Sequence, residues 1–385
     1  SSFINASVGN ILELDDVHRT SIIHPGDTII PAAIAASSST KIDSFNFLRA
    51  IIIGYETAIR MGKCLGVDHY KIFYSSATCG VFGAAAASSY ILNYKNNLST
   101  QLQNLNSSIQ LSTMTSSGVW QCRKGDGEAK QYALANASRA GLTSAFLAQN
   151  NANTPIDMIE GELGFLKGFA KTNDYSELIK KNDDHLIDEV SNKPWAACRH
   201  SHPVIGVSLE LKKEVNRLNL NIENIHEITI ETYQTAIDFC DKDNPQNDIE
   251  GKFSLQHCCA LSLIYENILE DYFKDNFLNN SSIKKIRDKI KLISNKKMTK
   301  SFPENYSASL EIKFNNGFTM KKISLDAKGD PENPMTEKEI CDKTIRLINN
   351  NNCNKFELLI KKIIVTDDEN DHSPITWFND LQKII

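Results

Sequence analysis

The sequence predicts an α+β protein of two domains, with a helical first half. The chain has 385 residues. A chain of this length usually folds around more than one hydrophobic core, so two domains are expected. Through the first half, apolar residues recur at helical spacing. Runs of alternating apolar and polar residues, which are typical of half-buried strands, occur only after Lys193. Helical spacing returns beyond Pro331 and Pro334. We therefore expect an α+β segment set into an otherwise helical chain.

Three segments of the first half are predicted to be helices. Residues 41–66 carry apolar side chains at helical spacing and end in Gly66, a residue suited to a helix C-cap. Residues 80–94 and 127–149 are rich in alanine and other small residues. Small side chains let helices approach closely, so we expect both segments to be buried helices.

The second half mixes strands and helices. Residues 226–233 alternate apolar and polar side chains, which predicts a half-buried strand. Residues 307–325 contain two alternating runs around an Asn-Asn-Gly sequence at 315–317, a strong signal for a β-hairpin. Helical patterns occur at 204–218, 254–270 and 336–348.

Composition excludes several classes of protein. The net charge of -5 argues against a nucleic-acid partner, because such binding needs a basic surface. The chain lacks a run of about 18 apolar residues and the basic and apolar segments of a signal peptide, so we expect a cytoplasmic protein with no membrane partner. Its nine cysteines are odd in number and form no C-x-x-C pair, which favours reduced thiols. Without such a pair or a glycine-rich phosphate loop, we expect no metal and no cofactor.

The densest polar cluster spans residues 15–31. It places Asp16, His18 and His24 close together, just before a Pro-Gly turn. An aspartate beside a histidine orients the imidazole and sets its proton affinity, which suits general acid–base chemistry. The alternative is a solvated loop with helix-capping aspartates. The two histidines are six residues apart and so not on one helical face, which disfavours a metal pair.

A second cluster spans residues 193–203. It contains two cations, a thiol and two histidines, namely Lys193, Arg199, Cys198, His200 and His202. Such a combination suits an anionic ligand. The alternative is an exposed crossing between the domains.

Two single residues are further candidates. Lys130 lies near the start of the alanine-rich helix, where a solvated helix end is the alternative to a ligand-binding role. His257 lies between Gln256 and Cys258 in an apolar helix, and is by default a hydrogen-bonded core histidine.

Blocks of sequence occur in the order that is typical of the MmgE/PrpD family, which this chain resembles. The first has an Asp-Asp-x-His run before a His-Pro-Gly turn. The blocks lie at 14–35, 55–60, 76–88, 130–148, 159–165, 193–206, 253–261 and 328–343. Each block alone is weak, but their shared order over about nine-tenths of the chain argues against chance.

The resemblance implies a fold and an assembly. It implies a large all-helical domain, made from residues 1–193 and 328–385, and a smaller α+β lid over 194–327. It also implies a homodimer and a cleft between the domains. Since the family begins earlier than this chain does, an N-terminal helical portion is expected to be missing.

The resemblance also implies an enzyme without a cofactor that acts on a small polycarboxylate substrate. Known members include 2-methylcitrate dehydratase, cis-aconitate decarboxylase and iminodisuccinate epimerase. Their shared chemistry is proton removal next to a carboxylate. Lys130 and Lys193 match the family's active-site lysines, Asp16 and His24 match its aspartate and its His-Pro-Gly histidine, and His202 matches a later histidine. We also expect substrate contacts from His18, Cys198 and Arg199.

Several positions depart from the family pattern. Tyr74 and Ala133 stand where histidines are usual, and His257 stands where a tyrosine is usual. If Tyr74 and His257 face one another, the two proton-transfer groups are exchanged, with His257 as base and Tyr74 as acid; the alternative is simple drift. Cys198 replaces a histidine of cis-aconitate decarboxylase, which weakens a decarboxylase interpretation.

The resemblance therefore implies a lyase, and our first expectation is a dehydratase of a hydroxy di- or tricarboxylic acid. An epimerase or a decarboxylase is the alternative within the family. A catalytically degenerate relative that only binds a ligand is the alternative of another class. The presence of Lys130, Lys193 and His24 argues against degeneration, because a protein that only binds has little reason to keep all three.

Overall fold

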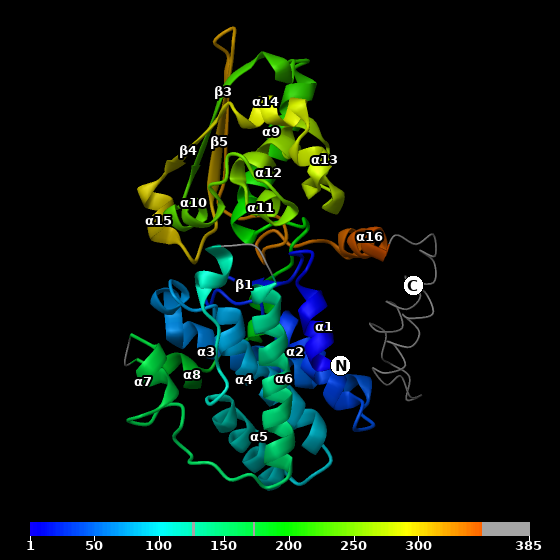
Figure 1. The fold of residues 1–385 in the computed structure, drawn as a ribbon, viewed down its shortest axis with the longest axis vertical. Coiled ribbons are helices and arrows are strands. Elements are labelled where there is room, and N and C mark those ends of the chain that lie inside the picture. Colours follow the sequence, from blue (N-terminus) through cyan, green and yellow to red (C-terminus); the bar gives the residue numbers. More distant parts are fainter. Residues whose placement is uncertain (125–127, 172–173, 349–385) are drawn as a thin grey trace. The chain divides into compact units, whose positions relative to one another are not determined.

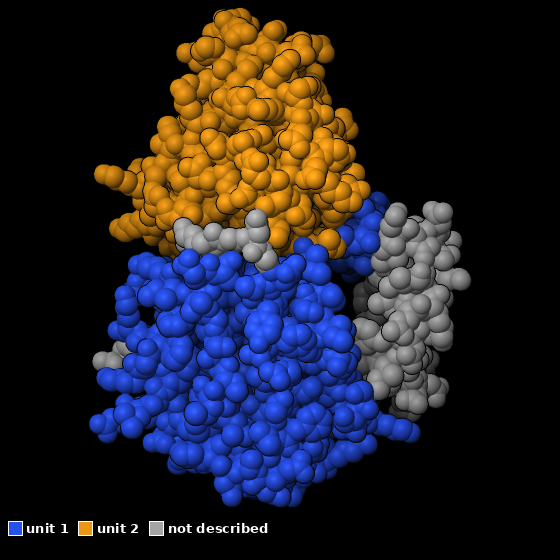
Figure 2. All heavy atoms as spheres, in the orientation of Figure 1, with its two compact units in different colours: residues 1–11, 15–190, 336–385 blue, residues 12–14, 191–335 orange. Residues whose placement is uncertain are grey.

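The computed structural model describes residues 1–124, 128–171 and 174–348. It divides into two compact units, which Figure 2 colours separately. Unit 1 consists of Ser1–Ile11, Asp15–Val190 and Thr336–Ile385, of which the part beyond residue 348 lies outside the described residues. Unit 2 consists of Leu12–Leu14 and Ser191–Met335.

Unit 1 is built almost entirely from helices (Figure 1). Its longer helices are α1 (Ser2–Gly9), α2 (Gly26–Ser37), α3 (Ser44–Tyr70), α4 (Ser75–Asn93), α5 (Leu98–Ser112), α6 (Ala129–Gln149) and α16 (Glu337–Ile348). Two short helices, α7 (Phe165–Phe169) and α8 (Ser176–Ile179), follow α6. Two short strands, β1 (Val17–His18) and β2 (Val190–Ser191), pair in a two-stranded sheet, and Ser191 of β2 belongs to unit 2.

Helix α4 forms the centre of unit 1 and packs against α2, α3, α5 and α6. Close packing depends on its small residues. A Cβ on Gly83 would lie 2.6 Å from the carbonyl oxygen of Gly54 on α3, and a Cβ on Gly141 of α6 would lie 2.6 Å from Ala84 Cβ. The buried helices predicted at 80–94 and 127–149 are thus confirmed, because small residues let their backbones meet.

Gly66 ends the first and longer of two helical segments that α3 combines, as predicted. It lies at the kink between them with a φ of 66° and a ψ of −170°, and a short second segment continues as far as Tyr70. Glycine adopts this backbone conformation without the steric cost that a Cβ would add. The turn after Gly66 is retained because it buries His69 and Tyr70.

Unit 2 contains a four-stranded sheet in the order β4-β3-β5-β6. Its strands are β3 (Ile225–Thr232), β4 (Ile290–Ser294), β5 (Ala308–Phe314) and β6 (Thr319–Ser324). Strand β3 pairs in parallel with β4 and antiparallel with β5, so that Ile228 lies opposite both Ile290 and Ile312. The strand predicted at 226–233 and the hairpin predicted at 307–325 are confirmed, with Gly317 at a φ of 85° in the turn.

Helices cover the sheet of unit 2 and complete its core. The longer ones are α9 (His202–Arg217), α10 (Gln234–Cys240), α12 (Leu255–Ile264) and α14 (Ser281–Arg287); shorter ones are α11 (Asp248–Lys252), α13 (Asp275–Leu278) and α15 (Lys296–Ser301). Helix α9 packs on β5 and β6, and α12 packs on α9. The helix predicted over 254–270 is shorter than expected, because Tyr265 is extended and ends α12. No helix in the described part of the chain is both long and apolar enough to span a membrane.

Candidate active site

The loop between α1 and α2 is a tightly bonded, mostly buried segment. Its residues His18 and Ile23 form an antiparallel bridge, and Asp15 and His18 are buried. A solvated loop, the alternative for this cluster, is therefore wrong. The carboxylates and imidazoles are instead held by specific partners within unit 1.

His24 is anchored through one ring nitrogen. Its Nδ1 lies 2.5 Å from Asp15 Oδ2 and 2.7 Å from the carbonyl oxygen of Asp16. Its backbone N–H donates to Ser76 Oγ at the start of α4, at 2.9 Å. Two oxygens beside Nδ1 assign the proton of the neutral ring to that nitrogen. In the described chain no group bonds to Nε2, and the side chain is 16% exposed, so Nε2 can accept a proton.

Asp16 holds the loop together. Its Oδ1 accepts a hydrogen bond from the Gly26 N–H at 3.0 Å, and its Oδ2 accepts one from the Tyr55 hydroxyl at 2.7 Å. Burial raises the pKa of Asp16, although both hydrogen bonds oppose that rise. Burial and the Asp16 charge raise the pKa of Tyr55 well above its ordinary value. With both oxygens engaged, Asp16 is placed to position His24 through its backbone carbonyl.

Asp15 is the carboxylate that contacts His24, and the sequence prediction had chosen its neighbour. Consecutive residues of an extended segment point to opposite sides, so only one of two adjacent aspartates can face the imidazole. The structure assigns this place to Asp15, whose side chain is fully buried. The sequence of two adjacent aspartates does not indicate which of them contacts the histidine.

Gly26, in the His-Pro-Gly turn, has a steric reason to be glycine. A Cβ at this position would lie 2.8 Å from the Tyr55 hydroxyl and 2.9 Å from Asp16 Oδ1. Contacts this short would push the tyrosine or the aspartate away. The glycine therefore keeps Asp16 within bonding distance of the start of α2.

His18 was predicted to bind substrate, and its contacts do not support that role. Its Nδ1 lies 2.7 Å from Ser21 Oγ, and its Nε2 lies 3.0 Å from Glu189 Oε2. Burial lowers the pKa of His18, so the ring is neutral and donates from Nε2 to Glu189. That hydrogen bond is the main cause that lowers the pKa of Glu189 to about 2. Because both ring nitrogens have protein partners, these contacts favour a structural role for His18, and its contact with substrate stays a prediction.

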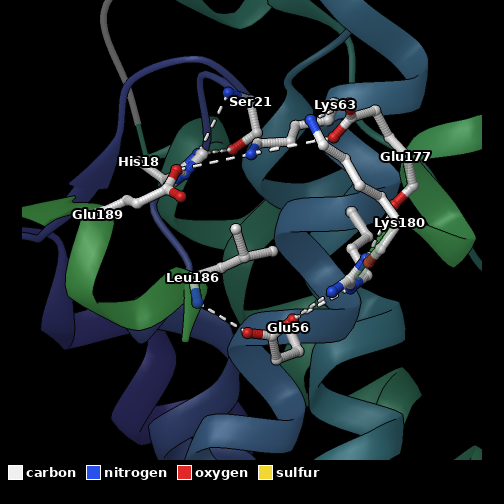
Figure 3. A network of polar contacts seen from close by, with 9 residues as sticks. His18, Ser21, Glu56, Lys63, Glu177, Lys180, Leu186 and Glu189 are labelled. Atoms are coloured by element: carbon white, nitrogen blue, oxygen red, sulfur yellow. Dashed lines mark hydrogen bonds and ion pairs between the residues drawn. The ribbon is translucent and has the colours of Figure 1, made fainter. Parts of the chain in front are cut away.

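A polar network on α3 supports Glu189 and His18 (Figure 3). Glu56 Oε1 accepts a hydrogen bond from the Leu186 N–H at 2.7 Å, and Glu56 Oε2 pairs with Arg60 at 3.0 Å. Lys63 lies one turn further along α3, with its Nζ 3.5 Å from Glu189 Oε2. The network fixes the segment that carries Glu189, and through it the loop that carries His24.

In unit 2 the cluster at 193–203 is also buried. Lys193 is 1% exposed, and Arg199, His200 and His202 are buried as well, so the alternative of an exposed crossing is wrong. The Lys193 ammonium donates to the Glu13 carbonyl oxygen at 3.2 Å and lies 3.7 Å from Glu13 Oε2. Glu13 had no place among the predicted site residues.

Arg199 and His202 serve the structure of unit 2. The Arg199 guanidinium bonds to Asp330 Oδ1, which also accepts from Ser191 Oγ at 2.5 Å. His202 lies with Nε2 3.2 Å from the Ala197 carbonyl oxygen. These contacts place both side chains in the buried structure of unit 2. Substrate binding by Arg199 and His202 stays a prediction.

The Cys198 thiol lies next to the Cys240 thiol. Burial works against ionisation of Cys198, but a hydrogen bond from Cys240 and the nearby Lys193 lower its pKa overall. Burial, together with the Cys198 thiol, raises the pKa of Cys240 well above its ordinary value. Cys198 is therefore close to Lys193 in unit 2, and its contact with substrate stays a prediction.

Three carboxylates of unit 2 are close enough to share a metal ion: Asp326, Asp330 and Glu332. Asp330 already bonds to Arg199, and its Oδ2 accepts from the Ala327 N–H at 2.7 Å. The arginine thus supplies the positive charge that a metal would supply. The group provides no argument for a metal site.

A surface pocket lies at the C-terminal end of α3, apart from the residues described above. It is lined by Lys63, Cys64, Leu65, Gly66, Val67, Asp68, Lys71 and Lys171. None of the residues predicted to carry chemistry contributes to it. The pocket therefore gives no support to the predicted site residues.

Both halves of the chain match models of known domains. Residues 1–178 match the MmgE/PrpD N-terminal domain, and residues 195–366 match the MmgE/PrpD C-terminal domain. The chain belongs to the MmgE/PrpD family. This confirms the resemblance that the order of its motifs predicted.

Two curated relatives of this MmgE/PrpD protein are named after reactions. A cis-aconitate decarboxylase-like protein of Aspergillus oryzae is 24% identical over 376 residues, which cover 90% of this chain and 75% of the relative. A probable 2-methylcitrate dehydratase of Saccharomyces cerevisiae is 23% identical over 209 residues, which cover 52% of this chain and 40% of that relative. The chain thus spans less than half the length of the second relative.

Among MmgE/PrpD positions, Tyr74 and His257 were predicted to act as an exchanged acid–base pair. Tyr74 is the N-cap residue of α4 in unit 1, and the centroid of its ring lies 4.5 Å from that of Trp120. His257 is fully buried in unit 2, with Nε2 3.3 Å from the Tyr272 carbonyl oxygen. Burial lowers the pKa of His257 to about 4. These contacts favour the default interpretation of His257 as a hydrogen-bonded core histidine, and its exchange of roles with Tyr74 stays a prediction.

Lys130 lies in the first turn of α6, at the position predicted from the sequence. It is half-buried rather than fully solvated. Its contact with a substrate carboxylate stays a prediction.

Proposed function

We propose that this MmgE/PrpD protein is a cofactor-independent lyase that dehydrates a small hydroxy di- or tricarboxylic acid. The observation that carries the proposal is the His24 arrangement, in which Asp15 holds Nδ1 and Nε2 has no bonding partner in the described chain. A histidine oriented by a carboxylate is the usual form of a general base. One of the relatives is named as a dehydratase, which agrees with such a reaction.

In the proposed reaction, His24 Nε2 takes a proton from the carbon next to a substrate carboxylate. The electron pair of that C–H bond forms a carbon–carbon double bond, and the adjacent C–O bond breaks. The hydroxyl leaves as water after it receives a proton from a protein group or from the imidazolium itself. The buried Asp15 carboxylate stabilises the imidazolium that forms in the first step.

Cations are needed to hold the substrate's carboxylates and to stabilise the charge that develops after proton removal. We assign this role to Lys130 in unit 1 and Lys193 in unit 2, the two lysines that match the family pattern. In this proposal a homodimer is the working form, as the family implies, and size-exclusion chromatography with light scattering would test it.

The experiment is NMR of the purified protein in deuterated water with a panel of citrate-like, aconitate-like and amino-dicarboxylate compounds. Loss of water with formation of an alkene supports the dehydratase. Deuterium exchange without net conversion would replace it with an epimerase, and release of carbon dioxide with a decarboxylase. Binding of panel members without exchange or conversion would show a degenerate relative. A His24→Gln variant serves as the control that links any turnover to this site.

A further inference from the structure

Three residues of the N-terminal segment, Leu12–Leu14, belong to unit 2, although the chain on both sides of them belongs to unit 1. Glu13 is the middle residue of this short insertion. Its φ is 56°, a left-handed conformation that is uncommon for a residue with a side chain. The backbone at Glu13 is thus held in this conformation by the contacts it makes.

The partner of Glu13 is Lys193. The ammonium donates a hydrogen bond to the Glu13 carbonyl oxygen at 3.2 Å, and Glu13 Oε2 lies 3.7 Å from it. The side chains of Lys193 and Glu13 are 1% and 8% exposed. A buried ammonium is costly unless an opposite charge compensates it. Glu13 therefore supplies a counter-ion to the lysine that we assign to substrate binding.

We propose that Glu13 is a resident carboxylate that a substrate carboxylate displaces from Lys193. The inference rests on the proposed function, because it takes Lys193 as a substrate-binding residue. The two contacts differ in a way that supports exchange. The backbone carbonyl is within hydrogen-bond distance, whereas the carboxylate contact is longer and so the weaker of the two. The carbonyl can keep the ammonium in place while the carboxylates exchange.

Exchange also preserves the charge balance at Lys193. A substrate carboxylate that bound beside an unmoved Glu13 would place two negative charges on one buried ammonium, which is unfavourable. Displacement of the Glu13 side chain avoids this repulsion.

The test is isothermal titration of citrate, as a tricarboxylate probe, into the whole protein and two variants. Glu13→Gln removes the charge and keeps the shape. Glu13→Gly removes the side chain and suits the positive φ, so it guards against misfolding of the first variant. We expect both to bind citrate about tenfold more tightly than the unchanged protein, the scale of one charge-assisted contact. Thermal melting should show a larger stabilisation by citrate in both variants.

The matched control is Glu210→Gln, which removes the partner of an exposed lysine, Lys322, elsewhere in unit 2. It should leave citrate affinity unchanged. Weaker or equal citrate binding by both folded Glu13 variants would overturn the displacement. If Lys193→Met still weakened citrate binding in that case, the proposed function would stand and only the role of Glu13 would fall. If Lys193→Met had no effect on citrate binding, both would fall.

Discussion

Asp15 Oδ2 lies 2.5 Å from His24 Nδ1, in a pair whose carboxylate is fully buried and whose imidazole is partly exposed. Of the two side chains, only the imidazole is therefore accessible from outside the protein. The buried carboxylate fixes the ring through Nδ1, while Nε2 lies on the other side of the ring and is the atom that we assign to proton transfer. The predictions for this pair follow from that geometry.

Replacement of His24 by glutamine should abolish proton abstraction. We expect kcat to fall by about 100-fold or more, the usual contribution of a general base, with a smaller change in KM. Deuterium exchange into the substrate, followed by NMR, measures the same step directly. The matched control is His185→Gln, because His185 is an exposed histidine of unit 1. Equal loss in both variants would show that the effect is not specific to the site.

Replacement of Asp15 by asparagine should lower kcat about tenfold or more, because it removes the buried charge that stabilises the imidazolium formed when His24 takes a proton. Asp16→Asn should instead act mainly on stability, since both Asp16 oxygens bond within the protein. Steady-state kinetics and urea unfolding of the two variants separate these effects. A larger kcat loss in Asp16→Asn than in Asp15→Asn would reverse the assignment.

Replacement of either candidate lysine by methionine should weaken substrate binding. A cation–carboxylate hydrogen bond contributes about 1.5–3 kcal/mol, so Lys130→Met and Lys193→Met should each reduce kcat/KM about ten- to a hundredfold. Lys167→Met, at an exposed position of unit 1, is the control. Unchanged catalytic efficiency in both active-site variants would remove the lysines from the proposal.

Replacement of Gly26 by alanine tests the packing of the His-Pro-Gly turn. The added Cβ would meet the Tyr55 hydroxyl at 2.8 Å and Asp16 Oδ1 at 2.9 Å. Overpacking of this kind costs about 1–3 kcal/mol of the free energy of unfolding, measured by urea denaturation. Gly168→Ala is the control, because a Cβ there would meet nothing within 4 Å. A stability loss of the same size at Gly168 would contradict the steric explanation.

Local sequence patterns predicted the elements whose burial is periodic. Strand β3 and the β5–β6 hairpin alternate apolar and polar residues, and α4 and α6 are rich in small residues, so each was expected at about its observed place. Strand β4 was not predicted. Most of its side chains are exposed or half-buried, and its place in the sheet comes from pairing with β3, which is distant in sequence.

The candidate site was predicted less completely than the fold. Its histidine was found because a His-Pro-Gly motif marks it, but Asp15 and Glu13 were not assigned their roles. Which of two adjacent carboxylates faces the imidazole depends on the backbone direction at that point. The contact between Glu13 and Lys193 joins residues 180 positions apart, and no local pattern reports such a contact.

His257 provides the last prediction, on stability against pH. Burial lowers its pKa to about 4 in the folded protein, whereas an unfolded histidine titrates near 6.5. Between these two pH values the unfolded state therefore binds more protons than the folded state. The contribution of the neutral His257 ring to the free energy of unfolding is fully present above pH 6.5 and is lost as the pH falls to about 4. The loss from this group reaches about 3 kcal/mol.

In His257→Gln, whose amide can still donate to the Tyr272 carbonyl oxygen, urea unfolding at several pH values should show a flatter decline of the free energy of unfolding between pH 6.5 and pH 4. Its kcat at pH 7 should stay within about threefold, because a core histidine takes no part in proton transfer. A hundredfold loss of kcat with an unchanged pH dependence of stability would return His257 to the catalytic residues.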